Sequence, residues 1–187
     1  MLTIKIIETG RKEIKKLGTD IEESINKIIE FIPKANLNGL DYIYVTDEPM
    51  EWKKHLANAA GAYFQKSKDA PAYIEIYLSR LFRNISSAES SQLMVPLRNI
   101  GIAWAVFHEI GHHVEKTKSH GIKKNNRERY AENYEKKLMA KYLFANADSI
   151  NSCFQNLEKV GNEKGLSQEI LRKMKEGWEA QFQDLCN

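Results

Sequence analysis

The sequence has few of the residues that cross-link a chain or keep it extended. Of 187 residues, only two are cysteine and four are proline, which excludes a disulfide scaffold and a proline-rich linker. Cys153 and Cys186 lack CxxC spacing, so two free thiols in a reducing compartment are expected. The longest uncharged apolar run, residues 100–107, is far shorter than the roughly 20 residues that span a bilayer. No membrane segment is therefore expected.

The sequence also lacks a strong excess of one charge. Its 28 Lys and Arg residues stand against 25 Asp and Glu residues, a formal net charge of +3. Nucleic acid is not the expected partner, because binding to phosphates needs a larger basic excess. The first eight residues place charges within an apolar run and offer no small-residue cleavage site, so no signal peptide is expected. These features predict a cytoplasmic protein.

Hydrophobic periodicity divides the chain into a part with strands and a part made of helices. The predicted strands, in β-branched or aromatic runs, cover residues 2–7, 42–45, 61–64 and 73–78, the last two as a hairpin. The predicted helices cover residues 20–31, 95–116, 126–146, 150–160 and 167–186. Strands followed by helices indicate an α+β fold. We expect one domain, 1–187, made of a sheet part (1–82), a middle pair of helices (83–147) and C-terminal helices (148–187).

The pattern H-E-x-x-H occurs at His108-Glu109-Ile110-Gly111-His112, inside the helix predicted over 95–116. Two histidines one turn apart, opposite the apolar stripe of the helix, bring both imidazoles to a single ion. Zinc is the expected metal. Glu109, one residue around the helix, is displaced from the ligand position but is close enough to act as general base toward a water on the metal.

A hydrolytic zinc site needs a third protein ligand and an open fourth position. The next predicted helix offers Glu128, Glu132 and Glu135 on one face, on a stripe that apolar residues continue. Carboxylates on such a stripe favour a bound cation over a solvated acidic face. Spacing alone leaves open which of them is the ligand.

The two helices together resemble the gluzincin class of zinc metallopeptidases, whose second metal helix has the pattern E-x-x-A-[DN]-x-[FY]. Here the stretch is Glu128-Arg-Tyr-Ala131-Glu132-Asn-Tyr134, with Glu132 in place of Asp or Asn. The resemblance implies that Glu128 is the third ligand. It also implies that Glu132 accepts a hydrogen bond from the outer nitrogen of a ligating histidine. The order of sheet and helices is similar to that of minimal members of the class, including ImmA/IrrE-type peptidases, which implies a zincin-like fold.

Two other ligand sets are less favoured. Some gluzincins place the third ligand at the distance of Glu132 from the second histidine, but the residue one turn later is then Lys136, which cannot accept a hydrogen bond from histidine. Metzincins need a third histidine six residues after His112, where this chain has Lys118. We therefore prefer His108, His112 and Glu128.

The resemblance implies a zinc-dependent peptidase that acts on a polypeptide, with a regulatory protein as one candidate substrate. One alternative is a metal-stabilised interaction module with little or no activity, and another is a hydrolase that acts on a different amide.

The strand over 73–78 is either an edge for an extended peptide or an internal strand. His113 is expected to be packed rather than a ligand. For an oxyanion donor, the sequence offers His120, Tyr130 and Tyr134 and does not single out one of them.

Overall fold

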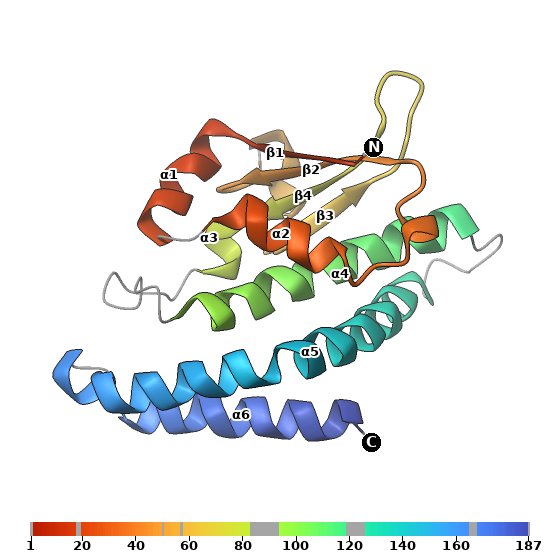
Figure 1. The fold of residues 1–187 in the computed structure, drawn as a ribbon. Coiled ribbons are helices and arrows are strands. Elements are labelled where there is room, and N and C mark those ends of the chain that lie inside the picture. The colour runs from red at the N-terminus through yellow and green to blue at the C-terminus, as the bar shows by residue number, and fades with distance from the viewer. Residues whose placement is uncertain are drawn as a thin grey trace.

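The computed structural model describes residues 2–17, 20–49, 51–56, 58–82, 94–118, 126–164 and 168–186. A four-stranded mixed sheet in the first part of the chain is followed by a half made of helices (Figure 1). The predicted α+β class is confirmed.

The sheet combines parallel and antiparallel pairing. Its strands are β1 (Thr3–Ile6), β2 (Leu40–Thr46), β3 (Gly61–Phe64) and β4 (Ala72–Tyr77), in the order β1-β2-β4-β3. The first three strands in that order are parallel, and β3 pairs antiparallel with β4 as the predicted hairpin. Because β4 lies between β2 and β3, it is an internal strand, and β3 forms the edge of the sheet among the described residues.

Two helices, rather than the one predicted, connect β1 to β2. They are α1 (Glu8–Leu17) and α2 (Ile21–Ile29), and only α2 was anticipated from the sequence. Asp20 caps α2 as expected, since its carboxylate accepts the Glu23 backbone N–H at 2.9 Å. Short helical turns complete this part of the chain: η1 (Lys34–Asn36), η2 (Glu51–Leu56) and α3 (Leu78–Leu81).

The helical half contains α4 (Val95–Lys118), α5 (Arg127–Lys164) and α6 (Gln168–Cys186). The prediction of separate helices over 126–146 and 150–160 is wrong, because α5 runs through both ranges without a break. No glycine or proline lies between them, and the buried Leu143, Ile150 and Phe154 keep one helical stripe in register across the join. The long helix is therefore held by its continuous apolar face.

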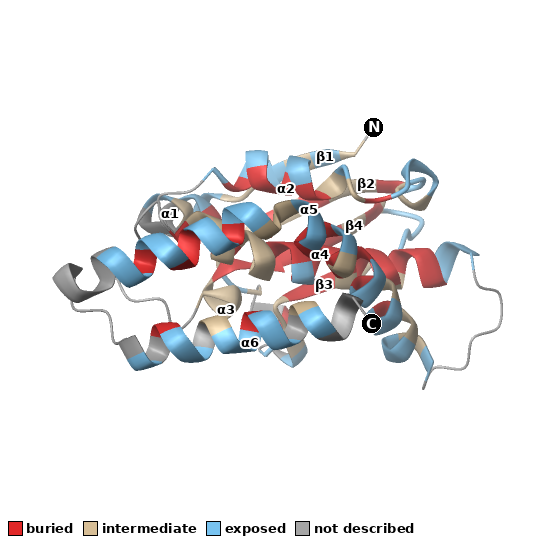
Figure 2. Ribbon diagram, turned by 60° about the horizontal axis from the view of Figure 1, so that its bottom comes forward, coloured by how far each residue is buried: buried red, intermediate tan, exposed pale blue. Residues whose placement is uncertain are grey.

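The elements form layers, with α4 packed between the sheet and α5, and α6 outside α5 (Figure 1). Figure 2 shows that α4 is buried over most of its length. Its Phe107 and Ile110 pack with Ile43 and Ile76 of the sheet and with Ile25 of α2 in one apolar cluster. Burial of this cluster fixes which face of α4 is turned away from the sheet core and left for polar side chains.

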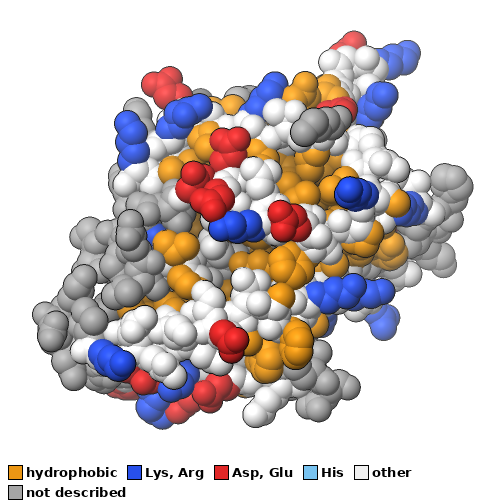
Figure 3. Space-filling model, viewed as in Figure 1, with side chains coloured by type: hydrophobic (Ala, Val, Ile, Leu, Met, Phe, Trp, Pro, Cys, Tyr) orange, Lys and Arg blue, Asp and Glu red, His pale blue; other side chains and the backbone are white. Residues whose placement is uncertain are grey.

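Basic and acidic side chains are interspersed on the face of the molecule drawn in Figure 3, without a large field of one sign. Within the described ranges, no helix has both the length and the apolar character needed to cross a membrane.

Candidate metal centre

His108 and His112 lie on α4, one helical turn apart, and their imidazoles face the same side. The ring centroids are 4.9 Å apart and the ring planes are nearly perpendicular, at 83°. Both side chains are largely buried. Trp104, one turn earlier, stacks on His108 with a centroid distance of 5.8 Å. The helix therefore presents two imidazoles in a fixed arrangement, as the spacing predicted.

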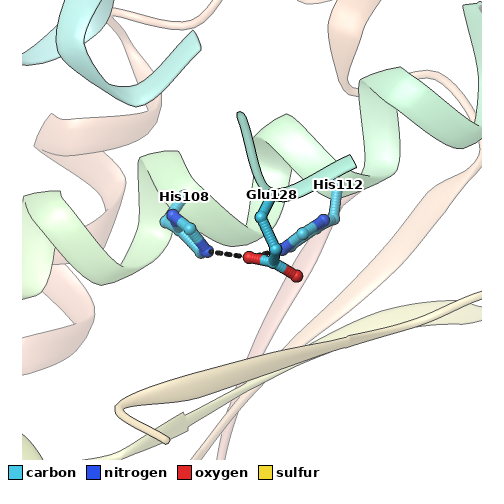
Figure 4. A group of neighbouring side chains, drawn as sticks. All are labelled: His108, His112 and Glu128. Carbon is cyan, nitrogen blue, oxygen red and sulfur yellow. Dashed lines mark ion pairs between the residues drawn. The ribbon is translucent and has the colours of Figure 1, made fainter. Parts of the chain in front are cut away.

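Glu128 approaches the two histidines from the first turn of α5 (Figure 4). Its Oε2 lies 3.6 Å from His108 Nε2 and 3.5 Å from His112 Nε2. The donor atoms of these three residues all lie within 4.8 Å of one another. The three residues proposed from the sequence as ligands are thus brought together.

The two distances from Glu128 Oε2 to the imidazole nitrogens suit a tetrahedral zinc ion. Donors about 2.0–2.2 Å from such an ion lie about 3.3–3.6 Å from one another. Imidazole nitrogen and carboxylate oxygen are also donor types that zinc prefers. The residues present therefore fit a zinc ion in chemistry and in the distances from the carboxylate to both imidazoles.

Glu135, rather than Glu132, lies against the outer nitrogen of His108. Its Oε2 is 3.0 Å from His108 Nδ1, and its side chain is buried. Glu132 is exposed, and in the described part of the chain it makes no hydrogen bond to either histidine. The prediction that Glu132 occupies this position is wrong: the carboxylate seven residues after Glu128, not four, points back to the histidine.

The contact with Glu135 sets the protonation of His108. A carboxylate only accepts, so Nδ1 carries the hydrogen and Nε2 keeps a lone pair directed at Glu128. The hydrogen bond to Glu135 raises the pKa of His108, whereas burial lowers the pKa of His112. With Nδ1 protonated, the neutral form of His108 turns its Nε2 lone pair toward the same side as Glu128 Oε2, as ligands of a shared metal ion would. A cation is the natural partner for both.

Glu109 is buried beside the histidines, with 7% of its surface exposed. Burial raises its pKa to about 7, while the nearby His108 and the Tyr63 backbone oppose the rise. Space for this carboxylate depends on Gly61, because a Cβ there would lie 3.0 Å from Glu109 Cγ and 2.9 Å from the Glu75 carbonyl oxygen. Glu109 therefore lies between the metal helix and the edge strand.

A cleft of about 630 Å³ opens in front of these residues. Its lining comes from η2 and the segment that follows, from β3, and from the facing ends of α4 and α5: Leu56, Ala59, Gly61, Ala62, Tyr63, His108, Glu109, His112, Glu115, Lys116, Arg127 and Glu128. At one end of the cleft lies an ion pair between Arg127 Nε and the buried Glu115 Oε1, at 3.6 Å. The cleft thus joins the candidate metal ligands to the free edge of the sheet.

The strand beside the cleft is β3, not the strand over 73–78 that the sequence left open as a peptide-binding edge.

Of the other candidate residues, His113 is fully buried, as expected for a packed side chain. Tyr134 accepts a hydrogen bond from Asn36 Nδ2 at 2.8 Å, and neither it nor Tyr130 lines the cleft. His120 lies outside the described residues. Sequence reasoning missed the roles of Glu135 and Tyr63; for Glu135, its place on the carboxylate stripe of α5 was the available signal.

In comparisons with protein-family models, with curated proteins and with solved structures, the chain has no match. The case for a function therefore comes from the geometry of the cleft.

Proposed function

We propose that this protein is a zinc-dependent peptidase of the gluzincin type, with a zincin-like arrangement of sheet and metal helices. One observation carries the proposal: His108 Nε2, His112 Nε2 and Glu128 Oε2 meet at the wall of a cleft whose neighbouring side chain is the buried Glu109. A structural zinc site would be closed by a fourth protein ligand. Within the described residues, only three side chains form this group.

Zinc bound by these residues would supply Lewis acidity, which polarises a carbonyl oxygen and makes a water molecule a stronger acid. Glu109 is the general base in this proposal. Its carboxylate takes a proton from the attacking water as the C–O bond forms, and gives it to the leaving nitrogen as the C–N bond breaks. Burial favours this role, because a carboxylate whose pKa is raised to about 7 both accepts and donates a proton near neutral pH.

The substrate in this proposal is an extended polypeptide that pairs with β3. The Ala60 carbonyl accepts the Tyr77 N–H at 2.9 Å. Because backbone hydrogen bonding alternates along an antiparallel strand, the N–H and C=O groups of Ala62 and Phe64 also point toward β4. The backbone groups of Gly61 and Tyr63 then face the free edge, where the cleft lies. An added strand would run along the cleft past the candidate ligands. The buried Cys153 keeps a thiol that forms no disulfide, which is consistent with a cytoplasmic location, and we include that location in the proposal.

The test compares the wild type with Glu109→Gln, using zinc content and cleavage of unfolded polypeptides as readouts. Glutamine keeps the size of the side chain but removes the base, so we expect one zinc per chain in both proteins and a fall in hydrolysis of about 100-fold or more. Glu132→Gln, at an exposed position on α5, is the matched control and should keep full activity. Zinc binding without cleavage by the wild type would point to the interaction module instead.

A further inference from the structure

The imidazole of His113 joins three elements of the fold beneath the cleft. This residue of α4 is 0% exposed. Its Nε2 lies 3.0 Å from the Asn38 carbonyl oxygen, just before β2, and its Nδ1 lies 3.3 Å from the Tyr63 hydroxyl on β3. The Tyr63 ring also packs edge-on against the imidazole, at a centroid distance of 5.4 Å.

The partners fix the direction of both hydrogen bonds. A carbonyl oxygen only accepts, so Nε2 of His113 carries the hydrogen and donates it to Asn38. In the neutral ring, Nδ1 then accepts from the Tyr63 hydroxyl.

Tyr63 is held by the metal helix at two points. Its hydroxyl donates to His113, and its backbone lies near enough to the Glu109 carboxylate to lower the pKa of that group. Glu109 and His113 are four residues apart and so lie one above the other on α4. One residue of the edge strand is thereby clamped along one turn of the helix that carries the candidate ligands.

We infer that His113 is a positioning residue, which fixes the edge strand against the metal helix through Tyr63 and so orients the Glu109 carboxylate. The inference rests on the proposed function for its catalytic consequence, but the mechanical link is a property of the fold alone. A peptide paired with β3 is placed relative to the metal ligands by the position of that strand. Displacements of about 1 Å between reacting groups reduce rates by up to roughly 100-fold.

The first variant is Tyr63→Phe, which removes only the hydroxyl and keeps the ring packed. We expect unchanged zinc content, a fall in kcat of roughly tenfold, and faster hydrogen exchange of the amides in residues 61–64. Tyr142→Phe is the control, because it removes another buried tyrosine hydroxyl, on α5 and away from the cleft. It should leave kcat and the exchange of residues 61–64 at wild-type values.

The second pair of variants tests His113 itself. His113→Gln provides both a donor for Asn38 and an acceptor for Tyr63, so it should retain most of the activity, whereas His113→Phe should behave as Tyr63→Phe does. Combining His113→Phe with Tyr63→Phe should reduce kcat no further than the larger single effect, because both changes break one link.

Two results would overturn the inference: wild-type exchange of residues 61–64 in Tyr63→Phe, or full and additive losses of activity in the double variant. Failure of the proposed function looks different. A wild type that cleaves no polypeptide removes the peptidase, while amide exchange still decides whether His113 and Tyr63 hold the edge strand.

Discussion

The backbones of α4 and α5 touch where Gly111 meets Ala131. A Cβ built on Gly111 would lie 2.7 Å from Ala131 Cα, closer than real Cβ atoms come to another atom, and 3.0 Å from the Ala131 carbonyl oxygen. Gly111 directly precedes His112, and Ala131 lies nearly one turn after Glu128. The two small residues therefore set the separation of the helices at the level of the candidate ligands.

Gly111→Ala should push the helices apart and draw Glu128 away from the histidines. Because the contacting atoms belong to backbone, relief requires movement of a whole helix, and we expect a loss of about 1–3 kcal/mol in the free energy of unfolding. Zinc affinity should fall as well. Denaturant unfolding and zinc titration measure both effects.

Gly101→Ala is the matched control on the same helix. The nearest atom to a Cβ there is Phe82 Cε1 at 3.9 Å, an ordinary contact. This variant should be as stable as the wild type or more so by up to about 1 kcal/mol, since alanine favours the helix. Equal behaviour of the two variants would show that the helix crossing does not depend on Gly111.

Glu135→Ala and Glu132→Ala should differ sharply in zinc affinity, although both remove a carboxylate from the same helix. Loss of the Glu135 contact with His108 Nδ1 should weaken zinc binding about 10- to 100-fold. The exposed Glu132 makes no such contact, so its replacement should leave the dissociation constant unchanged. Competition with a chromophoric chelator gives both constants, and a larger effect at Glu132 would restore the role implied by the family resemblance.

The sequence predicts which residues gather at the site, but it does not predict whether Glu132 or Glu135 contacts His108. Helical spacing puts both on the face of Glu128, and it correctly grouped His108, His112 and Glu128. Which carboxylate then meets His108 depends on the crossing angle of α4 and α5. Spacing along one helix carries no information about that angle.

The order of the strands was also beyond the sequence. The hairpin of β3 and β4 was predicted correctly, but either strand could have paired with β2. Parallel pairing of β2 with β4 makes β3 the edge and so decides which backbone lines the cleft. The predicted break between residues 146 and 150 does not exist, for a local reason: polar residues near Ser149 resemble a helix end, whereas buried Ile150 keeps α5 continuous.

A buried ion pair supports the sheet on the face away from α4. Lys53 is 1% exposed, and its Nζ lies 2.5 Å from Oε1 of the buried Glu75, whose Oε2 accepts the Tyr77 hydroxyl at 2.7 Å. Lys53→Met leaves the Glu75 carboxylate buried without its cation, so we expect a loss of about 3–5 kcal/mol in unfolding free energy.

The double variant Lys53→Met with Glu75→Gln removes the uncompensated charge and should recover part of that loss. Denaturant unfolding of the single and double variants, at matched pH, measures the difference. A double variant no more stable than Lys53→Met would mean that the uncompensated charge of Glu75 is not what destabilises the single variant.

Removal of zinc should lower thermal stability without unfolding the protein. The apolar cluster around Phe107 and Ile76 forms apart from the three candidate ligands, so folding does not depend on the metal. Free zinc at 100 times its dissociation constant stabilises the native state by about 2.7 kcal/mol, which for a chain of this size corresponds to about 5–10 °C in Tm.

Melting curves with a chelator and with added zinc should show this difference in the wild type. His112→Ala should abolish the difference, because only two of the three candidate ligands then remain. The control is His55→Ala, which replaces an exposed histidine on η2 and should preserve the difference. A zinc-dependent shift that persists in His112→Ala would place the bound ion elsewhere on the chain.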